Sequence, residues 1–163
     1  MKGYSIIETL IYSTILAFIA VLAVASIISS WRWFQKGKVD AQIARNGEFV
    51  LERVVRDVRL ADSVGVASVF GSNPGSLELI SGATSTKYSL SLQTIQRKEA
   101  NGNWENLTSA DSKITNIIFW NEFTSSSEIS SRIIKVEFTL ESGDGVFLKQ
   151  KKFFGSAVLR GSY

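Results

Sequence analysis

Cysteine and histidine are both absent from the 163 residues of this sequence. Without cysteine the chain can form neither a disulfide framework nor a thiolate metal site. Without histidine it also lacks the usual bases of Ser-His and Cys-His nucleophile pairs and the side chain best suited to proton transfer near neutral pH. No pair of carboxylates stands out for acid–base chemistry. We therefore expect no catalytic residues, no metal site and no cofactor, and a protein that is not an enzyme.

An excess of charge of either sign is lacking as well. The chain has 18 basic and 15 acidic residues, a net charge of +3, which indicates solubility rather than a nucleic-acid footprint. The basic residues Lys149, Lys151, Lys152 and Arg160 form the one cluster that could contact DNA or phospholipid. Such a run is more often a solvated strand face, so nucleic acid is the less favoured partner.

Proline is nearly absent, and none lies between Tyr4 and Ser63. Within this stretch, the 22 residues from Thr9 to Ser30 carry no charge. At 1.5 Å per residue, a helix over them is roughly 33 Å long, enough to cross a hydrocarbon core of about 30 Å. We therefore expect a membrane helix near the N-terminus, with room beyond it for one ordinary domain.

An acidic residue, Glu8, stands directly before this apolar run. A carboxylate inside a bilayer costs about 2.5–3.5 kcal/mol on insertion scales, and less near the interface. A chain that carries such a group generally has a partner for it. Glu8 is therefore the candidate functional residue of the segment.

The string Gly3-Tyr4-Ser5-Ile6-Ile7-Glu8, followed by Thr9-Leu10-Ile11, resembles the prepilin cleavage and methylation motif of type IV pilins and type II secretion pseudopilins. The resemblance implies cleavage between Gly3 and Tyr4, methylation of the new Tyr4 amine, and Glu8 as the fifth mature residue. A positive amine at Tyr4 of one subunit would neutralise Glu8 of its neighbour inside an apolar bundle. Because an unpaired charge is costly there, the pair would also fix the axial register.

The same resemblance implies the partners and the location. The partners are other pilin or pseudopilin subunits, a prepilin peptidase and methyltransferase, an inner-membrane assembly platform, and membrane lipid. The chain would cross the bacterial inner membrane once and then enter a filament on its outer side. The segments Leu51–Ala61 and Ile117–Trp120 further resemble J-type minor pseudopilins and W-type minor pilins, which implies a minor subunit.

Two other interpretations of the N-terminus stay open. A secretory signal peptide would have a small-residue cleavage site, and Ala23-Val24-Ala25 fits one. A plain single-pass anchor with an incidental glutamate is the other. Either would make the chain a membrane-anchored or secreted binding module.

Beyond the apolar run, the periodicity changes twice. From Val39 to about Ser63 the pattern is helical, and small or apolar residues recur every three or four positions at Ile43, Gly47, Val50, Val54, Val58 and Ala61. One helix approaching 60 residues is possible, with Gly37 and Gly47 as points where it bends or frays. A loop containing Gly65, Gly71, Asn73, Pro74 and Gly75 ends it.

The remainder indicates an antiparallel sheet. Expected strands are Leu77–Ile80, Lys87–Arg97, a short piece near Trp104, Ile114–Phe123, Ile133–Glu141 and Val146–Phe154, with a hairpin turn at Gly143-Asp144-Gly145. The predicted fold class is α+β, a long N-terminal helix whose second half packs on an antiparallel β-sheet, as in the pilin fold. The expected organisation is a leader (1–3), a transmembrane or filament-core helix (4–30), an amphipathic half-helix (31–64) and a β domain (65–163).

Overall fold

The structure is a computed structural model that describes residues 5–125 and 130–160. The chain divides between Lys38 and Val39 into two compact units. Helix α1 (Ile6–Leu60) contributes its first part to one unit and its second part to the other.

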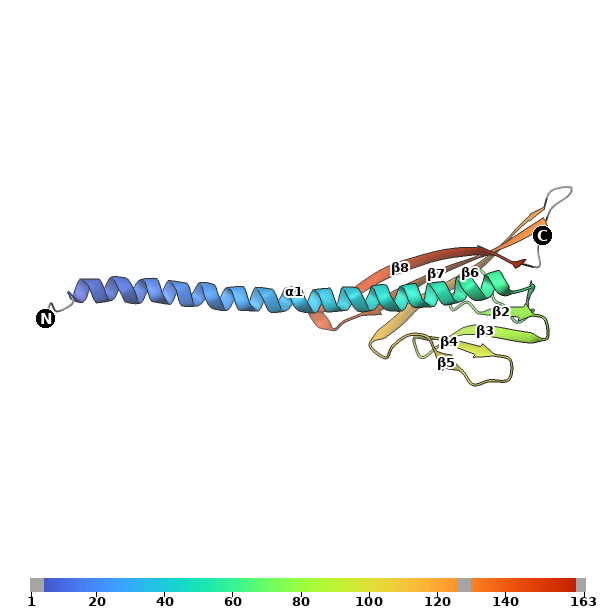
Figure 1. The fold of residues 1–163 in the computed structure, drawn as a ribbon, viewed down its shortest axis with the longest axis horizontal. Coiled ribbons are helices and arrows are strands. Elements are labelled where there is room, and N and C mark those ends of the chain that lie inside the picture. The colour runs from blue at the N-terminus through green and yellow to red at the C-terminus, as the bar shows by residue number, and fades with distance from the viewer. Residues whose placement is uncertain (1–4, 126–129, 161–163) are drawn as a thin grey trace. The chain divides into compact units, whose positions relative to one another are not determined.

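The second unit has the predicted α+β architecture. Its strands are β1 (Ser63–Val64), β2 (Leu77–Ser81), β3 (Thr84–Ser91), β4 (Thr94–Glu99), β5 (Glu105–Asn106), β6 (Ser112–Ser125), β7 (Ser130–Ser142) and β8 (Lys149–Val158). They form two antiparallel sheets in the orders β1-β2-β3-β4-β5 and β6-β7-β8. Figure 1 shows both sheets alongside the second part of α1.

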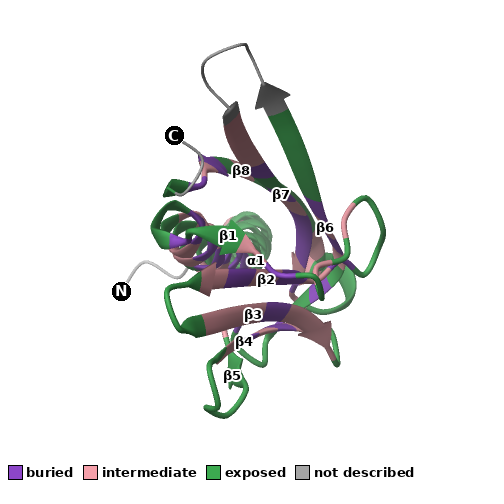
Figure 2. Cartoon of the chain, turned by 90° about the vertical axis from the view of Figure 1, so that its right-hand side faces the viewer, coloured by how far each residue is buried: buried purple, intermediate pink, exposed green. Residues whose placement is uncertain are grey.

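The helical stripe predicted from the sequence forms the centre of this unit. Its six residues, Ile43, Gly47, Val50, Val54, Val58 and Ala61, are all buried. Facing them are Leu77, Leu79 and Ile95 of the first sheet and Ile117, Phe119, Ile134 and Phe138 of the second. Figure 2 shows buried segments, in purple, on the helix and on strands of both sheets. Each fully buried side chain of this size stabilises the fold by roughly 1.5–3 kcal/mol, so the apolar stripe holds the helix on both sheets.

The part of the prediction that α1 frays at Gly37 and Gly47 is wrong, because the helix is continuous through both positions. Gly47 has a different role. A Cβ atom built on Gly47 would overlap the ring of Phe153 on β8. That ring is itself buried and stacks on Phe138, with 5.2 Å between the ring centroids. Glycine is therefore required at residue 47 for close approach of the helix and β8, not for flexibility.

This packing predicts opposite outcomes for the same substitution at the two helical glycines. Alanine is worth about 0.8–1.0 kcal/mol over glycine in a helix, but overpacking a core costs about 1–3 kcal/mol. Gly47→Ala should therefore lower the free energy of unfolding by up to about 2 kcal/mol. Gly37→Ala is the matched control and should not lower it, because no atom lies within 4 Å of its added Cβ. Urea unfolding of fragment 31–163 measures both; a more stable Gly47→Ala variant would contradict the packing argument.

The prediction of one strand over Lys87–Arg97 is wrong. The segment is a hairpin of β3 and β4 that turns at Leu92 and Gln93. Both residues have positive φ angles, 49° and 61°, a conformation that two-residue hairpin loops need and that glycine or asparagine normally supplies. The sequence has neither residue at this turn, so no turn signal interrupts the strand pattern.

The other predicted elements are confirmed with shifted ends. Helix α1 ends at Leu60 rather than near Ser63, where the two-residue β1 begins, and β6 and β7 are longer than predicted. The turn at Gly143-Asp144-Gly145 is confirmed, but it continues into a 3-10 turn over Gly145–Phe147 (η1), so β8 starts at Lys149 rather than Val146. Both glycines have positive φ angles, 93° and 54°, which explains why this connection was readable from the sequence.

Candidate functional site on the first part of helix α1

The predicted site residues lie at the start of the chain. Gly3 and Tyr4 lie outside the described residues, whereas Glu8 lies in the first turn of α1. The positive end of the helix dipole favours a carboxylate at this place. The backbone amide of Glu8 donates to the carbonyl of Ser5 at 3.0 Å, and the Tyr12 hydroxyl donates to Glu8 Oε1 at 3.4 Å. No cation is paired with Glu8 within the described residues.

Polar side chains within the apolar run bond to their own helix. The hydroxyls of Ser13 and Thr14 donate to the carbonyl of Leu10 at 2.9 and 2.8 Å, and Thr9 donates to Ser5 at 3.4 Å. Such bonds to a preceding turn satisfy hydroxyls without water. The run is therefore suited to surroundings that offer no hydrogen-bond partners.

Large apolar side chains of this part are exposed along the whole run, from Ile6 at 84% and Phe18 at 70% to Ile27 at 69%. The helix is long and apolar enough to cross a membrane, and none of its most apolar stretch is buried within the unit. Monomeric soluble proteins rarely expose a continuous apolar patch above a few hundred Å². A membrane anchor or a signal sequence accounts for such a segment.

Aromatic and basic residues follow the apolar run. Trp31, Trp33 and Phe34 are exposed, and Lys36 Nζ lies 5.9 Å from the centroid of the Trp33 ring. Tryptophan with basic residues is typical of a membrane–water interface, because the indole has an apolar body and a polar edge. The arrangement fits the point where a membrane helix leaves the bilayer.

In the second unit, a buried polar cluster that sequence reasoning missed joins α1 to the first sheet. Asp57 Oδ2 accepts hydrogen bonds from the Tyr88 hydroxyl at 2.6 Å and from Arg97 Nε at 2.9 Å. Arg97 Nη1 also lies 2.8 Å from Glu99 Oε2. Tyr88 and Arg97 are opposite one another in the β3–β4 register, and both are buried. Both side chains therefore reach the same carboxylate on the helix.

Burial, followed by the hydrogen bond to Asp57, raises the pKa of Tyr88 far above its usual 10.0. Burial acts to lower the pKa of Arg97, but hydrogen bonds to Asp57 and Glu99 outweigh it, and the pKa of Arg97 is raised. Tyr88 thus stays a neutral donor and Arg97 stays a cation. The cluster is suited to fixing the helix on the sheet, since the Tyr88 hydroxyl and Arg97 Nε of the sheet both donate to Asp57 of the helix.

Acidic residues of the same unit face the basic cluster that could contact nucleic acid. Lys149 Nζ lies 2.6 Å from Asp40 Oδ2, and Lys152 Nζ lies 3.6 Å from Glu137 Oε1. Lys151 Nζ lies 5.2 Å from the centroid of the Phe153 ring. This local compensation favours a solvated strand face over a nucleic-acid interface.

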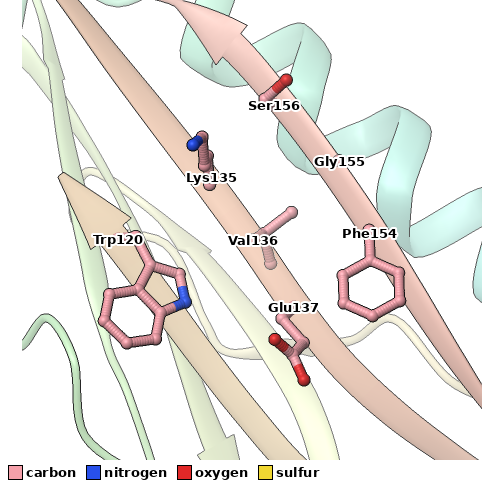
Figure 3. A pocket seen from close by; sticks show the side chains of 7 residues that line it. All are labelled: Trp120, Lys135, Val136, Glu137, Phe154, Gly155 and Ser156. Carbon is pink, nitrogen blue, oxygen red and sulfur yellow. The ribbon is translucent and has the colours of Figure 1, made fainter. Parts of the chain in front are cut away.

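One hollow of about 310 Å³ lies on the outer face of the second sheet. Figure 3 shows Trp120 of β6 on one side, Phe154 of β8 on the other, and Lys135 and Glu137 of β7 between them. Within the described residues, no group of three or more acidic side chains is placed to hold a metal ion.

Comparisons with protein-family models, with curated proteins and with solved structures give no match for this chain.

Proposed function

We propose that this chain is a structural subunit of a filament of the type IV pilus or type II secretion pseudopilus kind, and that it acts through the first part of α1. The observation that carries the proposal is the contrast within one helix. Residues 39–60 bury an apolar stripe in their own domain, whereas the apolar residues of the first part are uncovered and begin beside Glu8. We infer that another molecule buries these exposed apolar side chains.

In such a subunit, two different surroundings bury the apolar helix one after the other. Lipid surrounds the helix while the chain is anchored in the membrane, and the helices of neighbouring subunits replace that lipid in the filament. The hydroxyls of Ser13 and Thr14 bond within the helix and so suit both surroundings. Because lipid tails are as apolar as the side chains, packing and specific polar contacts decide assembly.

Glu8 supplies the specific polar contact. Cleavage between Gly3 and Tyr4 would create a positive amine four residues before Glu8. Four residues of helix span about 6 Å, so a neighbour displaced by roughly that distance along the axis would bring its Tyr4 amine level with Glu8. A matched pair removes the cost of an isolated charge in an apolar bundle. It also favours one displacement over others.

The finer proposal is a minor subunit that crosses the bacterial inner membrane once and then joins the filament on the outer side of that membrane. A prepilin peptidase and methyltransferase would process it, and an inner-membrane platform would extract it from lipid. We propose no catalytic role and no cofactor, and we keep nucleic acid as the less favoured partner. The resemblance of the N-terminal motif and of Leu51–Ala61 supports this finer proposal.

The mass of the natural mature chain tests the proposal. We expect a chain that starts at Tyr4 and carries one additional methyl group on its amine, measured by mass spectrometry of protein isolated from its own membranes. A chain that retains Met1, or one cut near Ala25, would contradict it. Either result would instead favour an anchored or secreted binding module.

A further inference from the structure

Strand β8 forms one edge of the three-stranded sheet. All ten of its residues are in register with β7, and no strand lies on its other side within residues 5–125 and 130–160. The opposite edge of the sheet is different. There the amides of Gly71 and Gly75 donate to the carbonyls of Phe119 and Ile117 of β6, both at 2.9 Å. A loop of the same chain thus covers part of β6, whereas β8 has no such cover among the described backbone bonds.

An uncovered edge presents a row of backbone N–H and C=O groups. Water satisfies them in the free protein, and the ligand that matches their spacing best is another extended polypeptide. At about 3.3 Å per residue, β8 offers an edge roughly 33 Å long. The chemistry of the edge therefore specifies a strand as its ligand.

Charge divides this edge into two halves. Lys149, Lys151 and Lys152 stand in the first half, and the second half, residues 153–158, carries no charge. Lysines on an edge strand oppose pairing with other chains, so only the first half is protected in this way. The second half is also held rigidly, because Phe153 stacks on Phe138 and Ala157 is buried.

The hollow beside the unprotected half can hold a side chain. Phe154 is 63% exposed on the outer face, and two residues farther along β8 the exposed Ser156 belongs to the same hollow. Lys135 and Glu137 on its floor already have ionic partners, Glu122 at 2.7 Å and Lys152 at 3.6 Å. Ser156 is opposite Lys135 of β7, so its short side chain lines the end of the hollow that is nearest the edge (Figure 3). An uncharged, apolar side chain suits this lining.

We propose that residues 153–158 of β8 bind an extended segment of a partner protein by strand addition. Backbone hydrogen bonds to the edge supply affinity, and an apolar side chain of the partner in the Trp120–Phe154 hollow supplies selectivity. An acidic residue of the partner is favoured where it passes Lys151. The inference goes beyond the filament role and does not depend on the N-terminal helix.

Hydrogen exchange of the full chain in detergent, resolved by residue, tests whether the edge is open. Alternate amides of β8 should exchange quickly because they point away from β7, while their neighbours on β8 exchange slowly. Slow exchange at every β8 amide would mean that the edge is already covered and would overturn the proposal. If the protection of the β8 amides from exchange rises with protein concentration, a second copy of this chain binds the edge. That result would overturn the proposal that a different protein is the partner.

A peptide selection tests binding. The probe is a random library of displayed peptides about ten residues long, the length of a long strand, selected on the full chain in detergent. Enriched peptides should alternate apolar residues and should protect the fast amides of β8. Ser156→Lys should weaken their binding by about tenfold or more, whereas Ser72→Lys, the same change at an exposed loop serine, should not. Failure to enrich any peptide, or binding indifferent to Ser156→Lys, would overturn the proposal.

Discussion

Replacing Asp57 by alanine should lower the free energy of unfolding by about 3–5 kcal/mol, the cost of removing one partner from a buried ion pair. The side chain of Asp57 is 11% exposed and that of Arg97 is 8% exposed, with 2.9 Å between Arg97 Nε and Asp57 Oδ2. Without Asp57, Glu99, which is 59% exposed, is the only acidic partner left to the guanidinium among the described residues, and the buried Tyr88 hydroxyl loses its acceptor. Urea unfolding of fragment 31–163 measures the loss.

Arg97→Met is the informative control. It leaves Asp57 with the Tyr88 hydroxyl and with two helical arginines, Arg53 at 3.9 Å and Arg56 at 3.8 Å. Because the carboxylate keeps the Tyr88 hydroxyl as a donor and two cations nearby, this variant should lower the free energy of unfolding by less, about 1–3 kcal/mol. The double variant should lose less unfolding free energy than the two single variants lose together, since each substitution removes the group that the other leaves unpaired. Equal losses in the single variants, or strict additivity, would contradict this account of the cluster.

The helix of this fold could be predicted from the sequence in some detail, and the reason is its simple periodicity. Every residue of the stripe from Ile43 to Ala61 is buried as expected, because spacing of three and four places residues on one face whatever packs there. The role of Gly47 could not be predicted, since only the position of the Phe153 ring shows why a Cβ is excluded.

The first sheet was less predictable because its turn is not marked in the sequence. Leu92 and Gln93 adopt positive φ angles without glycine or asparagine, so Lys87–Arg97 resembles one strand. The Asp57 cluster was missed for the same reason. Tyr88 and Arg97 become neighbours only once β3 and β4 are folded into a hairpin. The available signal was the acidic residue Asp57 directly before Val58 of the buried stripe.

The role of Glu8, unlike the buried stripe and the Asp57 cluster, is not visible in the structure of one chain. Its proposed chemistry depends on a group outside the described residues and on a second subunit. The structure places Glu8 in the first helical turn, and the motif supplies the Tyr4 amine as its proposed partner. The assembly role of Glu8 stays a prediction, and its substitution has the second large expected effect.

Glu8→Gln should leave membrane insertion intact and reduce incorporation into filaments by about tenfold or more, since a buried amine that loses its carboxylate costs several kcal/mol. Glutamine keeps the size of the side chain and removes only its charge, so a loss would report the ion pair rather than packing. Glu8→Ala should behave alike, and it should insert at least as well because it removes a carboxylate from the edge of the apolar run. Glu48→Gln, the same change at an exposed glutamate of the second unit, is the matched control.

The most direct test of the assembly role is the amount of Glu8→Gln chain in sheared filaments relative to its amount in membranes, measured by immunoblotting beside the unaltered chain. We expect a normal membrane signal and a filament signal reduced by about tenfold or more, with Glu48→Gln unchanged in both fractions. A Glu8→Gln chain as abundant in filaments as the unaltered one would contradict the proposal that Glu8 pairs with the amine of a neighbouring subunit.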